Sequence, residues 1–299
     1  MMATDIAATE VPATGVTSIE LAPNHKAGLT IANPVMPAAG CFGLGTEYTR
    51  LVEVDMLGAV IVGPITARSR RGAEPPRTLP IPGGALLHTG LANRGAAAIV
   101  RRYARAWASS PVPVIAHVAG TTPDETASCC ERLSAVDSVA GIELGLPDTL
   151  AHSPKPTDFL DDATAIIRTA KSAARQPLIV RLPLSWAGVL CVTAVDAGAD
   201  ALTIAAPPRG SMWHEPSGGF VTGRLYGSFV LPLALRALCR VAELVRVPLI
   251  GCGGIHSTKD ALAFLRADAV AIQVGGAIWR DPTCLARIAR SLSSVVPPC

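Results

Sequence analysis

The sequence predicts an α/β fold, a single (β/α)8 barrel of the TIM type. Eight short apolar runs rich in valine and isoleucine lie between residues 34 and 276. Such runs are typical of parallel strands that are buried on both faces. Segments with helix-start signals separate the runs, and a chain of 299 residues has room for eight strand–helix units. A doubly wound open sheet is the alternative, which the eight evenly spaced units disfavour.

In chain order, the predicted strands span residues 34–40, 58–66, 113–120, 141–146, 178–184, 201–207, 248–254 and 269–276. Three of the helices between them have clear start signals. Thr122 followed by Pro123 and Glu125 reads as an N-cap with proline at the first helical position. Residues 257–260 form a weaker capping box, and Asp281-Pro282 repeats the cap-then-proline pattern.

Two connections are too long to be plain turns, and both are rich in proline and glycine. They are residues 67–93, after the second strand, and 208–228, after the sixth strand. The loops that follow barrel strands form the face where barrels keep their active sites, so these two long loops should border the site. We expect residues 1–16 to be a flexible N-terminal tail and residues 17–299 to form the barrel.

Composition indicates a large buried core, because 49% of the residues are hydrophobic and only 16% are charged. The net charge is only +3, and the one dense basic stretch, residues 68–71, reads as a solvated loop and not as a nucleic-acid site. No run of 18 apolar residues predicts a membrane span, and no secretory signal is visible. The eight cysteines show no metal-binding spacing. These features favour a cytoplasmic protein without a metal site.

Two glycine pairs stand at the ends of the last two predicted strands. They are Gly253-Gly254 and Gly275-Gly276. Barrels often hold a phosphate with the loops after the seventh and eighth strands, where glycine lets backbone N–H groups approach the anion. The pairs therefore predict a phosphate-binding site, with tight turns as the alternative interpretation.

Several motifs along the chain resemble one family. They are NPVMPAAGCFGLGTEY (33–48), PGG and GLAN (82–93), VAG (118–120), VTGRLYG (221–227), IGCGGIHSTKDALAFL and AIQVGGAIWRDP. Over residues 17–292 the chain resembles the dihydroorotate dehydrogenases, FMN-containing barrels, and especially their soluble class. The resemblance implies FMN phosphate contacts at Gly227, Gly253, Gly254, Gly275 and Gly276, and a flavin ring against the backbone of Ala39 and Gly40.

The chain departs from this family where the catalytic base is expected. In the family, a cysteine or serine on the loop after the fourth strand lies in a segment like Glu-Leu-Asn-x-Ser-Cys-Pro-Asn. The matching segment here is ELGLPDT (143–149), which is two residues shorter and has neither serine nor cysteine before Pro147. The usual base is therefore absent.

Few residues are candidates to replace it. His117 could exchange a proton near neutral pH, with a barrel-mouth packing role as the alternative. Asp148 could act as a base on the shortened loop, although a helix-capping or surface role is the simpler interpretation. Cys41 is better explained as a small packing residue. His88 and His214 lie in the two long loops and could line the pocket.

The asparagines that hold orotate in the family are also missing. Their positions are occupied here by Leu87, His117, Gly145 and the pair Ala205-Ala206. Each lost hydrogen bond removes about 0.5–1.5 kcal/mol of net stabilisation. Orotate is therefore a doubtful ligand, and we expect a less polar substrate.

Two lysines of the family are replaced as well. Gly63 stands at the end of the second strand, and Arg181 stands in the fifth. Arg181 keeps a positive charge that could lie beside the flavin. The alternative is an internal ion pair, for example with Glu143.

Three functional hypotheses remain. The first is an FMN-dependent oxidoreductase that passes a hydride from an altered substrate to flavin N5. The second is a degenerate FMN- or phosphate-binding barrel that acts as a binding or partner subunit. The third is a dihydroorotate dehydrogenase of pyrimidine biosynthesis with an unusual base. The expected partners are a small-molecule substrate and either a second copy or an electron-transfer subunit, with neither nucleic acid nor membrane.

Overall fold

The computed structural model describes residues 18–120, 122–147 and 156–295. Its centre is a barrel of eight parallel strands in the order β3-β14-β13-β10-β9-β8-β7-β4, which β3 and β4 nearly close. The strands are β3 (Val35–Pro37), β4 (Val60–Ile65), β7 (Val114–Ala119), β8 (Val139–Gly145), β9 (Leu178–Pro183), β10 (Ala201–Ala206), β13 (Leu249–Cys252) and β14 (Ala269–Val274). All eight predicted strands, and with them the predicted barrel, are confirmed. The predicted tail, residues 1–16, and Asp148 lie outside the described residues.

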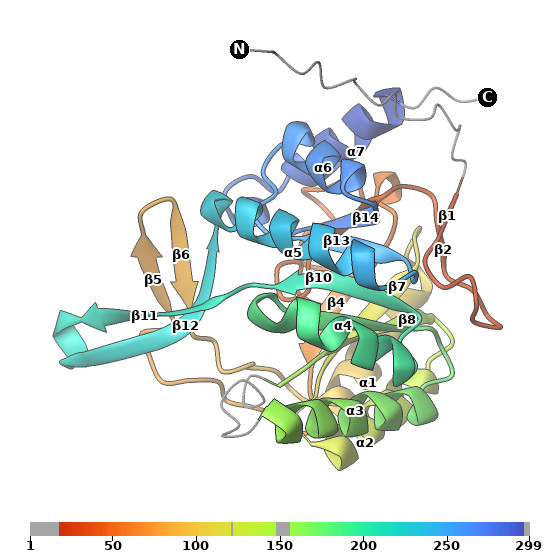
Figure 1. The fold of residues 1–299 in the computed structure, drawn as a ribbon, viewed down its shortest axis with the longest axis horizontal. Coiled ribbons are helices and arrows are strands. Elements are labelled where there is room, and N and C mark those ends of the chain that lie inside the picture. Colours follow the sequence, from red (N-terminus) through yellow and green to blue (C-terminus); the bar gives the residue numbers. More distant parts are fainter. Residues whose placement is uncertain (1–17, 121, 148–155, 296–299) are drawn as a thin grey trace, which may run out of the picture.

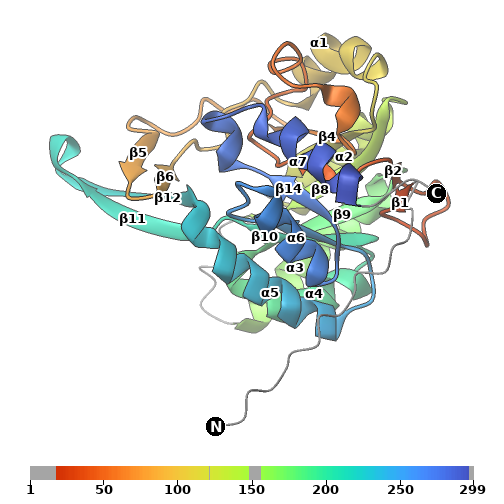
Figure 2. The same ribbon diagram turned by 90° about the horizontal axis from the view of Figure 1, so that it is seen from above.

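Helices surround the barrel (Figures 1 and 2). They are α1 (Ala96–Ala108), α2 (Pro123–Ser134), α3 (Pro156–Ala173), α4 (Ala187–Asp196), α5 (Leu231–Leu244), α6 (Thr258–Arg266) and α7 (Cys284–Val295). Short 3-10 turns are η1 (Val54–Met56), η3 (Leu184–Trp186), η4 (Glu215–Ser217), η5 (Ser228–Val230) and η6 (Gly276–Trp279).

The first strand–helix unit differs from the prediction, because only the short turn η1 lies between β3 and β4 among the described residues. Gly40, Gly43 and Gly45 in this connection all have positive φ. An α-helix requires negative φ at every residue, so this segment folds as a loop.

Two of the three predicted helix starts are confirmed. The Thr122 hydroxyl accepts a hydrogen bond from the Glu125 N–H at 3.3 Å, and Ser257 forms a reciprocal capping box with Asp260. The third start was predicted too early, since α7 begins only at Cys284. The carboxylate of Asp281 instead accepts a hydrogen bond from the Thr283 N–H at 3.0 Å and so holds the turn before the helix.

The two long connections are not plain loops, because each contains a β-hairpin. They contribute β5 (Thr78–Ile81) with β6 (Gly84–Leu87), and β11 (Arg209–His214) with β12 (Gly219–Gly227). The two hairpins join through β6 and β12 into one antiparallel sheet in the order β11-β12-β6-β5, which projects from the barrel (Figure 1). A lone hairpin is marginal in water, and this pairing gives each hairpin a partner.

Inside the barrel, apolar and polar layers follow one another. A short hairpin of β1 (Ile19–Glu20) and β2 (Thr30–Ile31) packs with an apolar cluster inside the barrel that includes Met36, Ile61, Ile115, Ile179 and Ile250. Buried polar side chains follow towards the carboxyl ends of the strands, at His117, Glu143, Arg181, Thr203 and Gln273. A second, larger apolar core lies between the strands and the outer helices.

The described residues hold six buried free cysteines and one exposed free cysteine, Cys239. No cluster of three or more metal-ligating side chains occurs among these residues. None of the helices that the structure describes is both long and apolar enough to cross a bilayer. A cytoplasmic location stays a prediction.

Candidate active site

A cavity of about 730 Å³ opens at the carboxyl ends of the barrel strands. It reaches from the barrel mouth to the antiparallel sheet, and its wall includes Ala39, Gly40, His117 and Arg181. The volume is in the range of sites that hold small molecules and cofactors. Residues predicted separately from three different strand ends therefore meet in one place.

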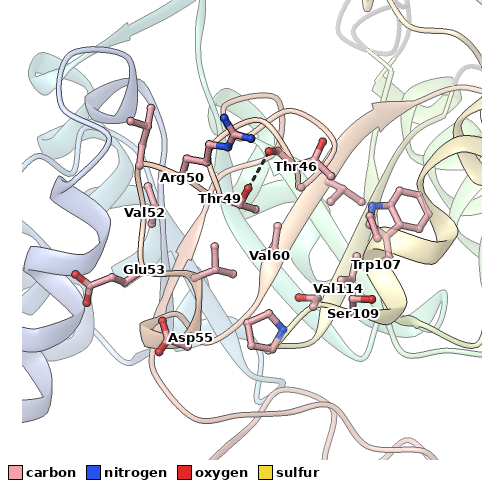
Figure 3. A pocket seen from close by; sticks show the side chains of 17 residues that line it. Thr46, Thr49, Arg50, Val52, Glu53, Asp55, Val60, Trp107, Ser109 and Val114 are labelled. Carbon is pink, nitrogen blue, oxygen red and sulfur yellow. Dashed lines mark hydrogen bonds between the residues drawn. The ribbon is translucent and has the colours of Figure 1, made fainter.

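A second hollow of about 680 Å³ lies on the outside of the barrel (Figure 3). Its wall comes from β4, the segment around η1, and α1, and includes Arg50, Glu53 and Trp107. It lies beside the first strand–helix unit, which has no full helix, and none of the predicted site residues line it. We therefore place the candidate site at the barrel mouth.

His117 and Glu143 form a buried pair on neighbouring strands β7 and β8. The two residues are register partners, and His117 Nδ1 lies 2.8 Å from Glu143 Oε1. Burial acts to raise the pKa of Glu143, but the charge of Arg181 and hydrogen bonds from His117 and Gln273 outweigh it and lower this pKa to about 2. An ionised carboxylate can only accept, so His117 Nδ1 carries a proton. In the neutral imidazole, Nε2 is then the acceptor.

Arg181 takes part in the same network. Its Nη1 lies 3.4 Å from Glu143 Oε1 and donates to Gln273 Oε1 at 2.5 Å, while its Nη2 donates to Cys252 Sγ at 3.0 Å. Burial acts to lower the pKa of Arg181, but the neighbouring Cys252 and Glu143 raise it, so the guanidinium stays charged. The internal ion pair with Glu143, one of the two predicted roles, is present. The side chain also lines the cavity.

The glycines at the two strand ends have different surroundings. A Cβ at Gly254 would lie 2.4 Å from the backbone nitrogen of Leu231, and one at Gly253 would lie 2.8 Å from the Cβ of Ala234. Packing against the start of α5 therefore requires glycine there. A Cβ at Gly275 or Gly276 would meet its nearest neighbours at 3.5 and 3.4 Å, which is ordinary contact.

Gly227 resembles Gly253 and Gly254, since a Cβ added at this position would lie 2.5 Å from the carbonyl oxygen of Gly83. Chain packing thus accounts for Gly227, Gly253 and Gly254 without a ligand. It does not account for Gly275 and Gly276, so a close approach of bound phosphate remains a reason for glycine at these two positions.

The turn after β3 presents backbone to the cavity. Ala39 and Gly40 line it, and Gly40 has φ of +79°. The next residue, Cys41, is only 3% exposed, and burial, with the nearby Cys252, raises the pKa of its thiol to about 12. Cys41 is therefore a packing residue and not a nucleophile at neutral pH.

The positions that depart from the family pattern also face the cavity. Leu87, His117, Gly145 and Ala206 all line it. Gly63 could not carry a side chain, because its φ is +128° and a Cβ would lie 2.7 Å from the carbonyl oxygen of His117. The part of the wall where the family has amides is thus apolar or small here, with one imidazole.

Of the two loop histidines, His88 lines the cavity. His214 is half-buried at the end of β11, where its Nδ1 lies 2.8 Å from the hydroxyl of Ser217. His214 therefore does not contribute to the cavity wall.

The sequence reasoning missed two groups of residues. Thr203 and Gln273 complete the network around Glu143, and a polar residue inside an apolar strand was the available signal for both. Arginines of the two long connections line the cavity at positions 70, 77, 209 and 224. Arg70 lines the cavity, although its side chain is 36% exposed and its neighbours Arg68 and Arg71 are exposed.

Comparison with known proteins agrees with this architecture. A family model described as dihydroorotate dehydrogenase matches residues 23–296. The chain is 36% identical over 278 residues to the catalytic subunit of dihydroorotate dehydrogenase B (NAD(+)) from Desulforudis audaxviator, which covers 89% of each chain. It is 35% identical over 276 residues to the subunit of the same name from Pelobacter propionicus, covering 90% of this chain and 91% of the other.

The relative of the same name from Geobacillus kaustophilus is 33% identical over 263 residues. The match covers 85% of this chain and 84% of that relative. Barrel, cavity and these matches lead to one conclusion. The chain belongs to the dihydroorotate dehydrogenase family.

Proposed function

We propose that the protein is an FMN-dependent oxidoreductase that oxidises a substrate other than dihydroorotate. The observation that carries the proposal is the cavity of about 730 Å³, where the backbone of Ala39 and Gly40, the charge of Arg181 and the imidazole of His117 face one space. Gly275 and Gly276 are not among the residues that line this cavity, but we propose that they contact the phosphate, since neighbouring atoms of the chain do not require glycine there.

Bound FMN would supply the acceptor for the hydride that leaves the substrate. The chain's own residues would bind and orient both molecules. Arg181 stays charged in its network, so it favours negative charge on whatever group lies beside it in the cavity. The buried apolar strands below close the barrel and exclude water from the floor of the site.

His117 is our candidate for the proton acceptor. Glu143 fixes its Nδ1–H at 2.8 Å, which directs the unprotonated Nε2 away from the carboxylate. When Nε2 takes a proton, the buried carboxylate stabilises the imidazolium that forms, as in other carboxylate–histidine pairs. This arrangement could replace the cysteine or serine base that the segment at 143–147 lacks.

The apolar wall of the cavity supports a substrate other than dihydroorotate. Leu87, Gly145 and Ala206 offer no side-chain hydrogen bonds where the family has amides. A pyrimidine ring bound there would lose several hydrogen bonds, each worth about 0.5–1.5 kcal/mol. The relatives are named catalytic subunits, and by analogy we propose that this chain also passes electrons to a partner subunit.

A binding role without turnover is the second candidate. Arg181 is satisfied by Glu143, Gln273 and Cys252 within the chain, so its positive charge does not itself require a flavin. A barrel of this kind could hold a phosphorylated ligand and carry out no oxidation.

The visible spectrum of the purified protein tests both candidates. We expect a yellow protein whose flavin is bleached by dithionite and is not bleached by dihydroorotate under anaerobic conditions. Bleaching by dihydroorotate would overturn the altered substrate. A colourless protein that takes up no added FMN would overturn the cofactor itself. A bound flavin that dithionite reduces but no acceptor reoxidises would favour the binding role.

A further inference from the structure

The cavity and the second glycine pair are separate spaces in this structure. Ala39, Gly40 and Arg181 line the cavity, whereas Gly275 and Gly276 do not. Both of these glycines are nevertheless partly exposed, so a small anion can approach them from outside the cavity. A larger molecule that contacts Arg181 and the glycine pair at once must pass the side chains that lie between them.

Two aromatic side chains lie at this boundary. Tyr226, near the end of β12, and Trp279, the last residue of η6, both line the cavity. A Cβ at Gly276 would lie 3.4 Å from the Cβ of Tyr226 and 3.7 Å from Cζ3 of Trp279. The two side chains therefore border the cavity on one side and Gly276 on the other. Their ring centroids are 4.9 Å apart, with 58° between the ring planes.

The phenol of Tyr226 extends from Gly276 towards the interior of the barrel. Burial, with the nearby thiol of Cys41, raises the pKa of its hydroxyl, while the charges of Arg224 and Arg181 act to lower it. Cys41 in turn borders the neighbouring glycine, because its Sγ lies 3.5 Å from the position of a Cβ at Gly275. The ring is thus close to Arg181 and to both glycines, and it fills the space between them.

No hydrogen bond within the described part of the chain fixes these two rings. Among the described residues, none pairs with the hydroxyl of Tyr226 or with the indole N–H of Trp279. Trp279 is also 39% exposed. A buried tyrosine hydroxyl usually has a hydrogen-bond partner that holds the side chain in one rotamer. Here ring packing holds it, so Tyr226 can turn to another rotamer when a ligand replaces those contacts.

We infer that Tyr226, supported by Trp279, controls whether one phosphorylated ligand can span the cavity and the second glycine pair. With the phenol in its present position, a phosphate monoester can reach the glycines or the cavity, but not both. When the phenol turns away, one molecule can place its phosphate at Gly275 and Gly276 and its ring system beside Arg181. The claim that this molecule is FMN rests on the proposed function.

The rate of FMN binding tests the inference on the purified full chain, stripped of any flavin. Stopped-flow measurement of flavin fluorescence gives the association rate. We expect FMN to bind to Tyr226→Ala at least tenfold faster than to the wild type, because the ring is gone. Tyr226→Phe keeps the ring and loses only the hydroxyl, so it should bind FMN at the wild-type rate.

A second variant covers the case in which Tyr226→Ala does not fold. Trp279→Ala removes an exposed ring that supports the phenol, and it should raise the association rate threefold or more. The matched control is Phe220→Ala, which removes an exposed aromatic ring from the same strand, outside the cavity wall. FMN should bind to this control at the wild-type rate.

Inorganic phosphate is the second probe, because it needs only the glycine pair. Its affinity, measured by titration calorimetry, should be equal within twofold in the wild type and in Tyr226→Ala. If the variant bound phosphate more tightly by the same factor as FMN, the ring would only cover the glycines and would not divide two spaces. That result would overturn the inference.

Failure of the inference and failure of the proposed function give different results. Equal rates of FMN binding in the wild type and in Tyr226→Ala would overturn the inference and leave the cofactor in place. A wild type that takes up no FMN, beside a Tyr226→Ala variant that does, would support the inference and overturn the proposed cofactor. If neither protein takes up FMN, both claims are wrong.

Discussion

The imidazole of His117 lies in the space that a side chain at Gly145 would occupy. A Cβ at position 145 would be 2.9 Å from His117 Cε1 and 3.0 Å from Nε2. Both positions carry asparagine in the family pattern, and they lie on the paired strands β7 and β8. The two departures from that pattern are therefore one structural change, in which the loss of one side chain makes room for a larger one.

Gly145→Ala should displace the imidazole of His117. We expect the variant to lose about 1–3 kcal/mol of folding stability through overpacking. Chemical denaturation measures the loss, and ¹⁵N spectra of the histidine ring should show a change in the environment of Nε2. Gly219→Ala is the control, because a Cβ there meets no atom within 4 Å. Equal stability of the two variants would contradict the packing that we describe.

Glu143→Gln should destabilise the protein strongly. The change removes the negative charge that faces Arg181 and His117 inside the barrel, and breaking a buried ion pair costs about 3–5 kcal/mol. Denaturant unfolding measures the difference. Glu53→Gln breaks the exposed contact with Arg290 and should leave stability nearly unchanged. If both substitutions had the same small effect, Glu143 would not organise the network.

The stability of the protein should fall in acid through Glu143. Its pKa is about 2 in the folded chain, against an ordinary value of 4.5. A lowered folded pKa gives stability that is fully present above pH 4.5 and is lost as the pH falls towards 2. The loss attributable to this group is about 3 kcal/mol, at roughly 1.4 kcal/mol per pH unit. The free energy of unfolding, measured by denaturation at several pH values, should fall more steeply between pH 5 and pH 2 in the wild type than in Glu143→Gln.

The two glycine pairs should respond differently to alanine. Gly254→Ala places a Cβ 2.4 Å from the Leu231 nitrogen at a φ of +70°, so we expect a clear loss of thermal stability. Gly276→Ala places its Cβ 3.4 Å from the nearest atom, so the fold should tolerate it. FMN content per protein should nevertheless fall in Gly276→Ala, because the Cβ stands where the phosphate is proposed to approach. Unchanged FMN content there would remove the support that this position gives to the phosphate site.

The barrel was readable from the sequence because strands buried on both faces leave continuous apolar runs, and all eight were found. The start of α7 was placed too early, since Asp281 and Pro282 form a turn that resembles a helix cap in sequence alone. The missing first helix was not predicted either. Only the positive φ angles of Gly40, Gly43 and Gly45 reveal that this segment cannot be helical.

The site was predicted in part. Residues at strand ends were found, because the carboxyl ends of barrel strands converge by geometry. The arginines of the two long connections that line the cavity were not predicted. Their approach depends on the pairing of β6 with β12, which lie more than a hundred positions apart in the chain. No local pattern specifies such a pairing. Arg70 accordingly looked like part of a solvated loop.

The pairing of β6 with β12 has a consequence for how the molecule assembles. Tyr226 pairs with Ala85, so the sheet closes a long loop of chain that contains four of the eight barrel strands, β7 to β10. Contacts between residues so far apart in sequence form slowly, because the chain between them must first lose its freedom. The pairing of β14 with β3, which helps to close the barrel, joins residues still farther apart, at Ile272 and Val35. We therefore expect both the closed barrel and the outer sheet to form late in refolding, so that the chain becomes able to select a ligand only in the last steps of folding.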